Sequence, residues 1–181
     1  TTETRMRIER RSLTLGLPVI AAWRARPANL DHRFRDPARS RHRSAPMIHR
    51  IAIKVRGYHL DLYRHVNNAR YLEFLEEARW SFLESEGSLD YLQDQGYTFA
   101  LVNININYRR AAYLGEVLEI ATSVKSIGNR SCVMHQLVTL QGEGTVVADA
   151  DVTFVIVDTR TERAAPLEGA LRAALLREMA E

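Results

Sequence analysis

The sequence predicts an α+β domain: a curved, antiparallel five-stranded sheet wrapped around one long central helix, with a further helix at the C-terminus. One long segment has apolar residues at helical spacing, and five segments have the pattern of strands. Four of these strands follow one another through short turns, so we expect them to form an antiparallel meander. The long helix lies between the first two strands, and it can bury its apolar face only against the concave face of the sheet.

The first strand is predicted at residues 49–57, where apolar and basic residues alternate. The next ten residues have no period and are expected to form a loop that ends at a helix cap, either Asn67 or Asn68. The long amphipathic helix follows at residues 69–85. We expect Glu86-Gly87-Ser88 to end this helix and a short helical turn to follow.

Four more strands are predicted at residues 97–108, 116–128, 129–141 and 145–158. The middle two are joined through Gly128-Asn129, which is typical of a hairpin turn. Pro166 is expected to open the final amphipathic helix, because its fixed φ suits the first helical turn. The apolar side of that helix carries Leu167, Leu171, Ala174 and Leu175.

Composition limits the class of protein. The chain has 181 residues, 46% of them hydrophobic and 26% charged, which is typical of one globular domain with an appendage. No apolar run reaches the ~20 residues that a membrane-spanning helix needs, so we expect no stable membrane insertion. The single cysteine, Cys132, excludes an internal disulfide framework and a zinc site built from several thiolates.

Charge divides the chain at Met47. Residues 1–46 carry 11 arginines, no lysine and four acidic residues, a net charge of +7, whereas residues 47–181 carry 14 basic and 18 acidic residues, a net charge of −4. We expect residues 1–46 to be a basic, disordered extension. These residues would then be either part of the native protein or a stretch translated upstream of a true start at Met47. A signal peptide and a nucleic-acid-binding arm are the alternatives. The first lacks a clear cleavage site and the second lacks interleaved aromatic residues, so we expect no nucleic-acid partner.

Residues 56–71 carry the clearest chemical signal, because Asp61 stands a few residues before the start of the long helix. A helix N-terminus presents unpaired N–H groups and partial positive charge, which can stabilise an oxyanion. A carboxylate beside it can activate water as a general base or attack as a nucleophile. A hydrolase of an activated acyl group needs these two parts, although an ordinary loop aspartate has the same spacing.

The pattern D-x-x-x-H-V-N-N-x-x-Y-x-x-x-x-E-x-A-R, from Asp61 to Arg79, resembles the hotdog-fold thioesterases of the 4-hydroxybenzoyl-CoA thioesterase type. IKVRGYHLDLYRHVNNARYLEFLEEARW, VNININYRR, VVADADVTFV and PLEG are similar, in this order, to the bacterial long-chain acyl-CoA thioesterase group of that family. The similarity extends from about Ile51 to the last helix and leaves residues 1–46 unmatched.

This resemblance implies a hotdog fold that works as a homodimer or homotetramer, with each site between two subunits. It implies no metal or redox cofactor, since CoA is part of the substrate. It places Asp61 on the catalytic carboxylate, and the backbone N–H of Asn68 where the thioester oxygen is held. His65 and Asn67 fall on the adjoining loop, where His65 is expected to assist catalysis and Asn67 to contact the substrate as shaping or polar groups. Tyr71 falls on the first helical turn, where it is expected to line the acyl pocket.

Two positions depart from the family pattern. Many members have glycine where this chain has Arg64, and many have an acidic residue where it has His59. The Arg64 side chain is expected to narrow the entrance or to contact a CoA phosphate.

Two further segments complete the predicted substrate contacts. Asn105 lies in a stripe with Asn103 and Asn107, and asparagine is poor in strands, so we expect this stripe to face the site from the partner subunit. A hydrogen-bonded dimer edge is the alternative. Candidates for binding the CoA phosphates are Arg109, Arg110, Lys125 and Arg130.

Other assignments of the acidic and histidine residues are weaker. His59, Asp61 and His65 have no standard metal-ligand spacing, and a carboxylate that orients a histidine is the better interpretation. Glu76 and Glu77 are rival general bases on the central helix, but a solvated helix face with Arg70 and Arg79 nearby is the better interpretation.

The sequence therefore predicts a cytoplasmic acyl-CoA thioesterase that hydrolyses medium-to-long fatty acyl-CoA to free fatty acid and CoA, in β-oxidation or in clearing stalled acyl-CoAs. One alternative is a hotdog thioesterase that acts on an aromatic acyl-CoA or an acyl-carrier-protein thioester. The other is a non-enzymatic acyl-CoA-binding regulator. Chain-length preference, the choice between base and nucleophile at Asp61, and the choice between dimer and tetramer stay open.

Overall fold

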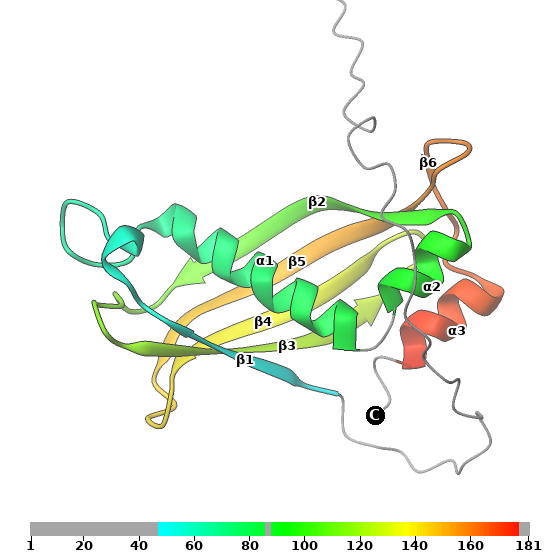
Figure 1. Cartoon of the computed structure of the whole chain (residues 1–181). Helices are drawn as coiled ribbons and strands as arrows, with labels where there is room; N and C mark the ends of the chain where they lie inside the picture. The colour runs from blue at the N-terminus through cyan, green and yellow to red at the C-terminus, as the bar shows by residue number, and fades with distance from the viewer. Residues whose placement is uncertain (1–46, 86–87, 178–181) are drawn as a thin grey trace, which may run out of the picture. The chain divides into compact units, whose positions relative to one another are not determined.

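The computed structural model describes residues 47–85 and 88–177 (Figure 1). The predictions for residues 1–46 and for a helix end at Glu86-Gly87 lie outside the described residues. Within the described ranges, no helix combines the length and the apolar character needed to cross a membrane.

The elements follow the predicted order. They are β1 (His49–Lys54), a 3-10 helix (Gly57–His59), α1 (Asn68–Ser85), α2 (Ser88–Asp94), β2 (Tyr97–Tyr108), β3 (Val117–Ile127), β4 (Cys132–Leu140), β5 (Val146–Asp158), β6 (Arg163–Ala164) and α3 (Gly169–Arg177). The first strand ends three residues earlier than predicted, and α3 begins at Gly169 rather than at Pro166. The sheet also gains a sixth, two-residue strand, β6, which pairs with β5.

The antiparallel sheet has the order β1-β3-β4-β5-β2, so the predicted four-strand meander is wrong in one respect. β3, β4 and β5 do form consecutive hairpins, but β2 pairs with β5 instead of β3. The reason is that β1 occupies the side of β3 that β2 would need. β2 therefore lies at the far edge, and α1 crosses the sheet between the two edge strands (Figure 1).

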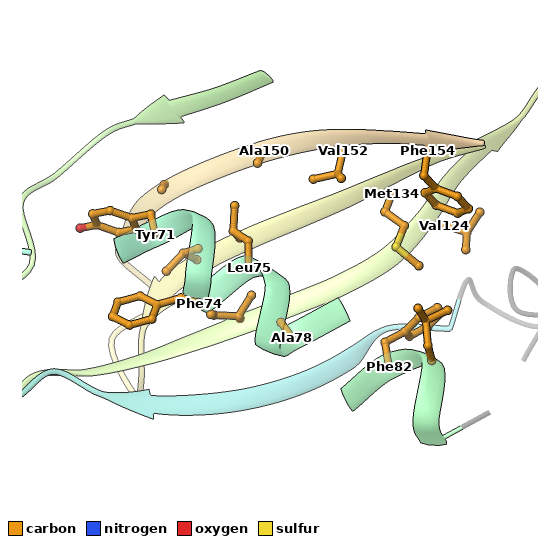
Figure 2. Close-up of a cluster of buried hydrophobic side chains, with 14 of the residues drawn as sticks. Tyr71, Phe74, Leu75, Ala78, Phe82, Val124, Met134, Ala150, Val152 and Phe154 are labelled. Atoms are coloured by element: carbon orange, nitrogen blue, oxygen red, sulfur yellow. The ribbon is translucent and has the colours of Figure 1, made fainter. Parts of the chain in front are cut away.

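α1 packs on the concave face of the sheet, as predicted. Its buried residues recur at helical spacing, and they meet the inward-facing residues of the central strands, such as Met134, Val152 and Phe154 (Figure 2). The helix residues in this core are Tyr71, Phe74, Leu75, Ala78, Phe82 and Leu83. Burial of this apolar face orients the helix, so its N-terminus comes to lie beside the loop that carries Asp61.

Candidate active site

The loop before α1 folds back on itself. Leu60 forms an isolated β-bridge with Val66, and the Asp61 N–H donates to the His65 carbonyl at 3.0 Å. The Val66 N–H donates in turn to the Ala112 carbonyl at 2.8 Å, which ties the loop to the segment after β2. These backbone bonds hold Asp61 opposite His65, immediately before the start of the helix.

The Asp61 carboxylate is held in one orientation by its own loop. Its Oδ1 accepts a hydrogen bond from the Tyr63 N–H at 2.8 Å, and its Oδ2 lies 3.4 Å from Nδ1 of His65. The His65 ring stacks on Tyr63 with centroids 5.8 Å apart. The Asp61 side chain keeps 20% of its surface exposed, so the carboxylate is both oriented and accessible. That combination suits a general base or a nucleophile.

Asn67, rather than Asn68, caps α1. Its Oδ1 accepts from the Ala69 N–H at 2.9 Å, and its carbonyl accepts from the Arg70 N–H at 2.9 Å. Its own N–H donates to the His59 carbonyl at 3.0 Å. Asn67 was one of the two expected cap positions, and the structure shows that it is the cap. Its predicted contact with the substrate stays a prediction.

The backbone N–H of Asn68 has no acceptor among the described residues, and Asn68 is exposed. It lies at the positive end of the helix dipole, where an N–H can stabilise developing negative charge. The structure therefore places the two predicted parts, the Asp61 carboxylate and an open N–H, at the same end of α1.

His59 supports the loop from the core side. Only 7% of its surface is exposed, its Nδ1 accepts from the Arg56 N–H at 3.0 Å, and its ring meets Phe74 edge-on at 4.8 Å. Burial, followed by the charges of Arg70 and Arg56, lowers the pKa of His59. Because Nδ1 accepts the hydrogen bond from the Arg56 N–H, it carries no proton, and the lowered pKa favours the neutral ring.

Tyr71 and Tyr108 pack against each other beside the first turn of α1. The Tyr71 ring is 2% exposed and meets Tyr108 edge-on at 5.3 Å. Burial raises the pKa of Tyr71 to about 12, against a smaller opposing effect of the Ala112 backbone. The Tyr108 hydroxyl donates to the Asn68 carbonyl at 3.1 Å. Nothing in the chemistry of the sequence singled out Tyr108, and the only signal was its expected place opposite the asparagine stripe of its strand. Contact between Tyr71 and an acyl chain stays a prediction.

Asn105 and Arg109 lie on the outer face of the sheet, so within one protomer the structure does not bring them together with Asp61. The cause is the pleat of β2, which directs Ile104 and Ile106 towards the core and the intervening residues away from α1. Asn105 lies opposite Asp151 in the register of β2 and β5. A contact of Asn105 with a partner's site stays a prediction.

The predicted phosphate-binding cations already have partners in the protomer. Arg109 Nε donates to Asp149 at 2.6 Å, Arg110 pairs with Glu116 at 2.8 Å, and Lys125 pairs with Asp151 at 2.6 Å. The fourth candidate, Arg130, donates to the Ala164 carbonyl at 3.2 Å. The three carboxylates partly neutralise Arg109, Arg110 and Lys125, which makes these three side chains weaker phosphate ligands than the sequence pattern suggested.

Arg64 has a positive φ of 64°, in the left-handed region that favours glycine. This backbone conformation closes the tight loop between Asp61 and His65, and it explains why glycine suits the position in the sequence pattern. An arginine at this place is a genuine departure, and its exposed side chain projects from the loop next to Asp61.

Comparison with known proteins identifies the family. A family model described as "Thioesterase-like superfamily" matches residues 55–175. The chain is 54% identical over 120 residues to "Long-chain acyl-CoA thioesterase FadM" of Escherichia coli (strain K12), a match that covers 66% of this chain and 91% of that protein.

Solved structures agree with this match. The crystal structure of YbaW, a probable thioesterase from Escherichia coli, has a TM-score of 0.69 and 51% identity, and covers 73% of this chain and 98% of that chain. Slr0204, a 1,4-dihydroxy-2-naphthoyl-CoA thioesterase from Synechocystis, has a TM-score of 0.63 and 20% identity, with 72% and 96% covered. At that lower identity the likeness concerns the fold alone.

The positive φ at Arg64 leads to a stability prediction. Replacing Arg64 by glycine removes a left-handed penalty of about 1–2 kcal/mol, and the greater freedom of the unfolded chain offsets about 0.4–1 kcal/mol of this gain. We therefore expect Arg64→Gly to raise the free energy of unfolding slightly, as measured by urea denaturation.

The matched control is Arg56→Gly, because Arg56 is also exposed but has a φ of −112°. Only the cost in unfolded-chain freedom applies there, so this variant should be less stable than the wild type. Equal destabilisation by both changes would contradict the role given to the backbone at Arg64.

Proposed function

The chain belongs to the thioesterase-like superfamily, and we propose that it hydrolyses long-chain fatty acyl-CoA thioesters to a free fatty acid and CoA. The hotdog fold expected from the sequence is confirmed by the matching thioesterase structures. The observation that carries the proposal is the accessible Asp61 carboxylate at the end of α1 where the Asn68 N–H is open.

The proposed reaction begins when the thioester oxygen accepts a hydrogen bond from the Asn68 N–H. Asp61 takes a proton from a water molecule, and the water oxygen attacks the carbonyl carbon. The negative charge that develops on the carbonyl oxygen is stabilised by the N–H and by the helix dipole. The C–S bond then breaks, and the CoA thiolate receives the proton from Asp61.

Asp61 can instead attack the carbonyl carbon directly and form an acyl-anhydride, which water then hydrolyses. The two routes give the same products. A single turnover in ¹⁸O-labelled water separates them, because only the second route can leave label in the Asp61 side chain. In both routes His65, with its Nδ1 3.4 Å from Asp61, acts as the residue that keeps the carboxylate oriented.

We also propose that the working form contains at least two copies that meet along β2. β2 and β1 are the two edge strands of the sheet, and exposed edges pair with other chains unless they are short or charged. β1 has six residues with two cations, whereas none of the 12 residues of β2 is charged. Leu101 and Val102 on β2 are 52% and 56% exposed.

A second exposed apolar group lies beside the site. Leu62 and Tyr63, which follow Asp61, are 89% and 75% exposed. Apolar side chains this open are typical of surfaces that another chain or a ligand covers. They support a site completed by the partner subunit, with the acyl chain between the two copies.

The cellular setting of the reaction is part of the same proposal. We propose that the protein acts in the cytoplasm, where its reaction accompanies β-oxidation or removes stalled acyl-CoAs.

The substrate class is tested by steady-state hydrolysis of acyl-CoAs from four to eighteen carbons, together with an aromatic acyl-CoA and an acyl-carrier-protein thioester. We expect kcat/KM to rise with chain length and to be highest among the long acyl-CoAs. A preference for the aromatic or carrier-protein thioester would replace the fatty acyl assignment while keeping the thioesterase. Binding of acyl-CoA without any turnover would favour the regulator.

The role of Asp61 is tested by Asp61→Asn, which keeps the shape and removes the charge. We expect kcat for palmitoyl-CoA to fall by at least about 100-fold, since proton transfer in general acid–base catalysis contributes 10²–10⁴-fold. The control is Glu77→Gln, because Glu77 is an exposed carboxylate on α1 and a rival base. Retained turnover in Asp61→Asn would refute the mechanism, and loss of turnover in Glu77→Gln would move the base to the helix.

The β2 interface is tested by Val102→Lys, which places like charges on both copies of an exposed edge. We expect the mass measured by light scattering to fall to that of one chain and kcat/KM to fall at least tenfold. Ala52→Lys, at an exposed position of β1, is the control and should change neither quantity. An unchanged mass in Val102→Lys would exclude β2 as the contact.

A further inference from the structure

Two polar side chains lie in the middle of the apolar face that supports α1. Gln136 and Thr122 are both 0% exposed, and they stand opposite each other in the register of β4 and β3. Their neighbours on the same face of these strands are apolar: Leu118, Ile120, Val124, Cys132, Met134, Val138 and Leu140. Burial of a polar group costs free energy unless the group is fully hydrogen-bonded, so the two side chains must find hydrogen-bond partners inside the core.

The Gln136 amide forms three hydrogen bonds. Its Nε2 donates to the Leu75 carbonyl of α1 at 2.9 Å and to Thr122 Oγ1 at 3.0 Å. Its Oε1 accepts from Arg79 Nη1 at 3.0 Å. The reverse orientation of the amide would put its oxygen against a carbonyl oxygen and its NH₂ against a guanidinium. The partners therefore determine a single orientation.

Arg79 is the charged member of this group, which we call the Gln136 clamp (Thr122, Gln136, Arg79 and the Leu75 carbonyl). Burial lowers the pKa of Arg79, while the nearby charge of Glu76 acts in the opposite sense. Among the described residues no buried side-chain nitrogen or oxygen lacks a hydrogen-bond partner, so the clamp is satisfied. A satisfied polar group in an apolar core favours one arrangement of the packed elements over its near neighbours.

We propose that Gln136, supported by Thr122 and Arg79, is a positioning residue for the reaction at Asn68. Apolar packing of α1 on the sheet is non-directional and tolerates small shifts along the helix axis. The bond from Gln136 to the Leu75 carbonyl is directional and connects one backbone atom of α1 to the central strand β4. Leu75 is seven residues from Asn68, about 10 Å along the axis at 1.5 Å per residue.

Two attachments then determine where the Asn68 N–H lies. At the start of α1, the Tyr108 hydroxyl holds the Asn68 carbonyl, and in the middle of the helix the Gln136 clamp holds the Leu75 carbonyl. Two directional hydrogen bonds at separate points along the helix restrict both its sliding along the axis and its tilting at the N-terminus. This precision matters because a misplacement of about 1 Å can cost 10²-fold in rate.

The inference rests on the proposed thioester hydrolysis, and the first test is Gln136→Met, which keeps the size of the side chain and removes its hydrogen bonds. We expect kcat for palmitoyl-CoA to fall about tenfold with KM within about twofold of the wild type. Such a split is the mark of an interaction that acts on the transition state rather than on binding.

Thr122 supplies a milder pair of variants. Thr122→Val keeps the shape but removes the acceptor for Gln136 Nε2, whereas Thr122→Ser keeps the hydroxyl. We expect kcat to fall about threefold in Thr122→Val and to stay within about 1.5-fold of the wild type in Thr122→Ser. These two variants test whether the Gln136 clamp affects kcat even if Gln136→Met fails to fold.

Val138→Ala is the control for lost stability, because Val138 is buried on the same face of β4 and takes no part in the clamp. We expect its melting temperature to fall at least as far as that of Gln136→Met, with kcat unchanged. Equal losses of kcat in the two variants, or an unchanged kcat in folded Gln136→Met, would overturn the clamp. A wild-type protein without acyl-CoA hydrolysis would instead refute the proposed function.

The double variant Arg79→Met/Gln136→Met separates positioning from the cost of an unpaired guanidinium. If the Leu75 bond positions the helix, kcat stays low although the melting temperature recovers. Recovery of kcat together with stability would overturn the proposal, because the effect would then come from the buried charge of Arg79.

Discussion

The cap of α1 by Asn67 is the interaction on which the candidate site depends. The Asn67 side chain accepts the Ala69 N–H, and the Asn67 carbonyl accepts the Arg70 N–H. The Asn67 N–H donates to the His59 carbonyl on the other side of the loop. The cap therefore holds the loop that carries Asp61 close to the helix start, together with the bond from the Val66 N–H to the Ala112 carbonyl. Because the cap uses the Ala69 N–H and leaves that of Asn68 open, the geometry that stabilises the helix also creates a place for an oxyanion.

The sheet positions α1 in two ways. Its concave face buries one side of α1 and so sets the rotation of the helix, while the polar pair at its centre restricts movement along the helix axis. Its edges differ in chemistry, since β1 is short and charged and β2 is long and uncharged. The same fold thus presents a rigid platform for the helix and an edge suited to a second copy, which is consistent with a site shared between subunits.

The outer face of the sheet carries a network of ion pairs that the sequence alone did not predict. Asp149 and Asp151 each bind two side chains there: Asp149 holds Asn107 and Arg109, and Asp151 holds Lys125 and His135. These contacts lower the pKa of both carboxyls, chiefly through the hydrogen bonds from Arg109 and Lys125. Arg109 and Lys125, which look available for phosphate in the sequence, are therefore partly neutralised by two carboxylates of β5.

The sequence by itself determined the order of the main helices and strands, the helix on the concave face, the loop that presents Asp61 and the family. Each of these depends on local periodicity, capping residues or a contiguous motif. It did not determine that β2 pairs with β5, that Asn67 rather than Asn68 is the cap, or that Asn105 and Arg109 face away from α1. It also gave no sign that Tyr108 and Gln136 hold the helix. Those features depend on contacts between residues distant in the chain, and only the tertiary structure decides which strand edges are free and which polar groups meet inside the core.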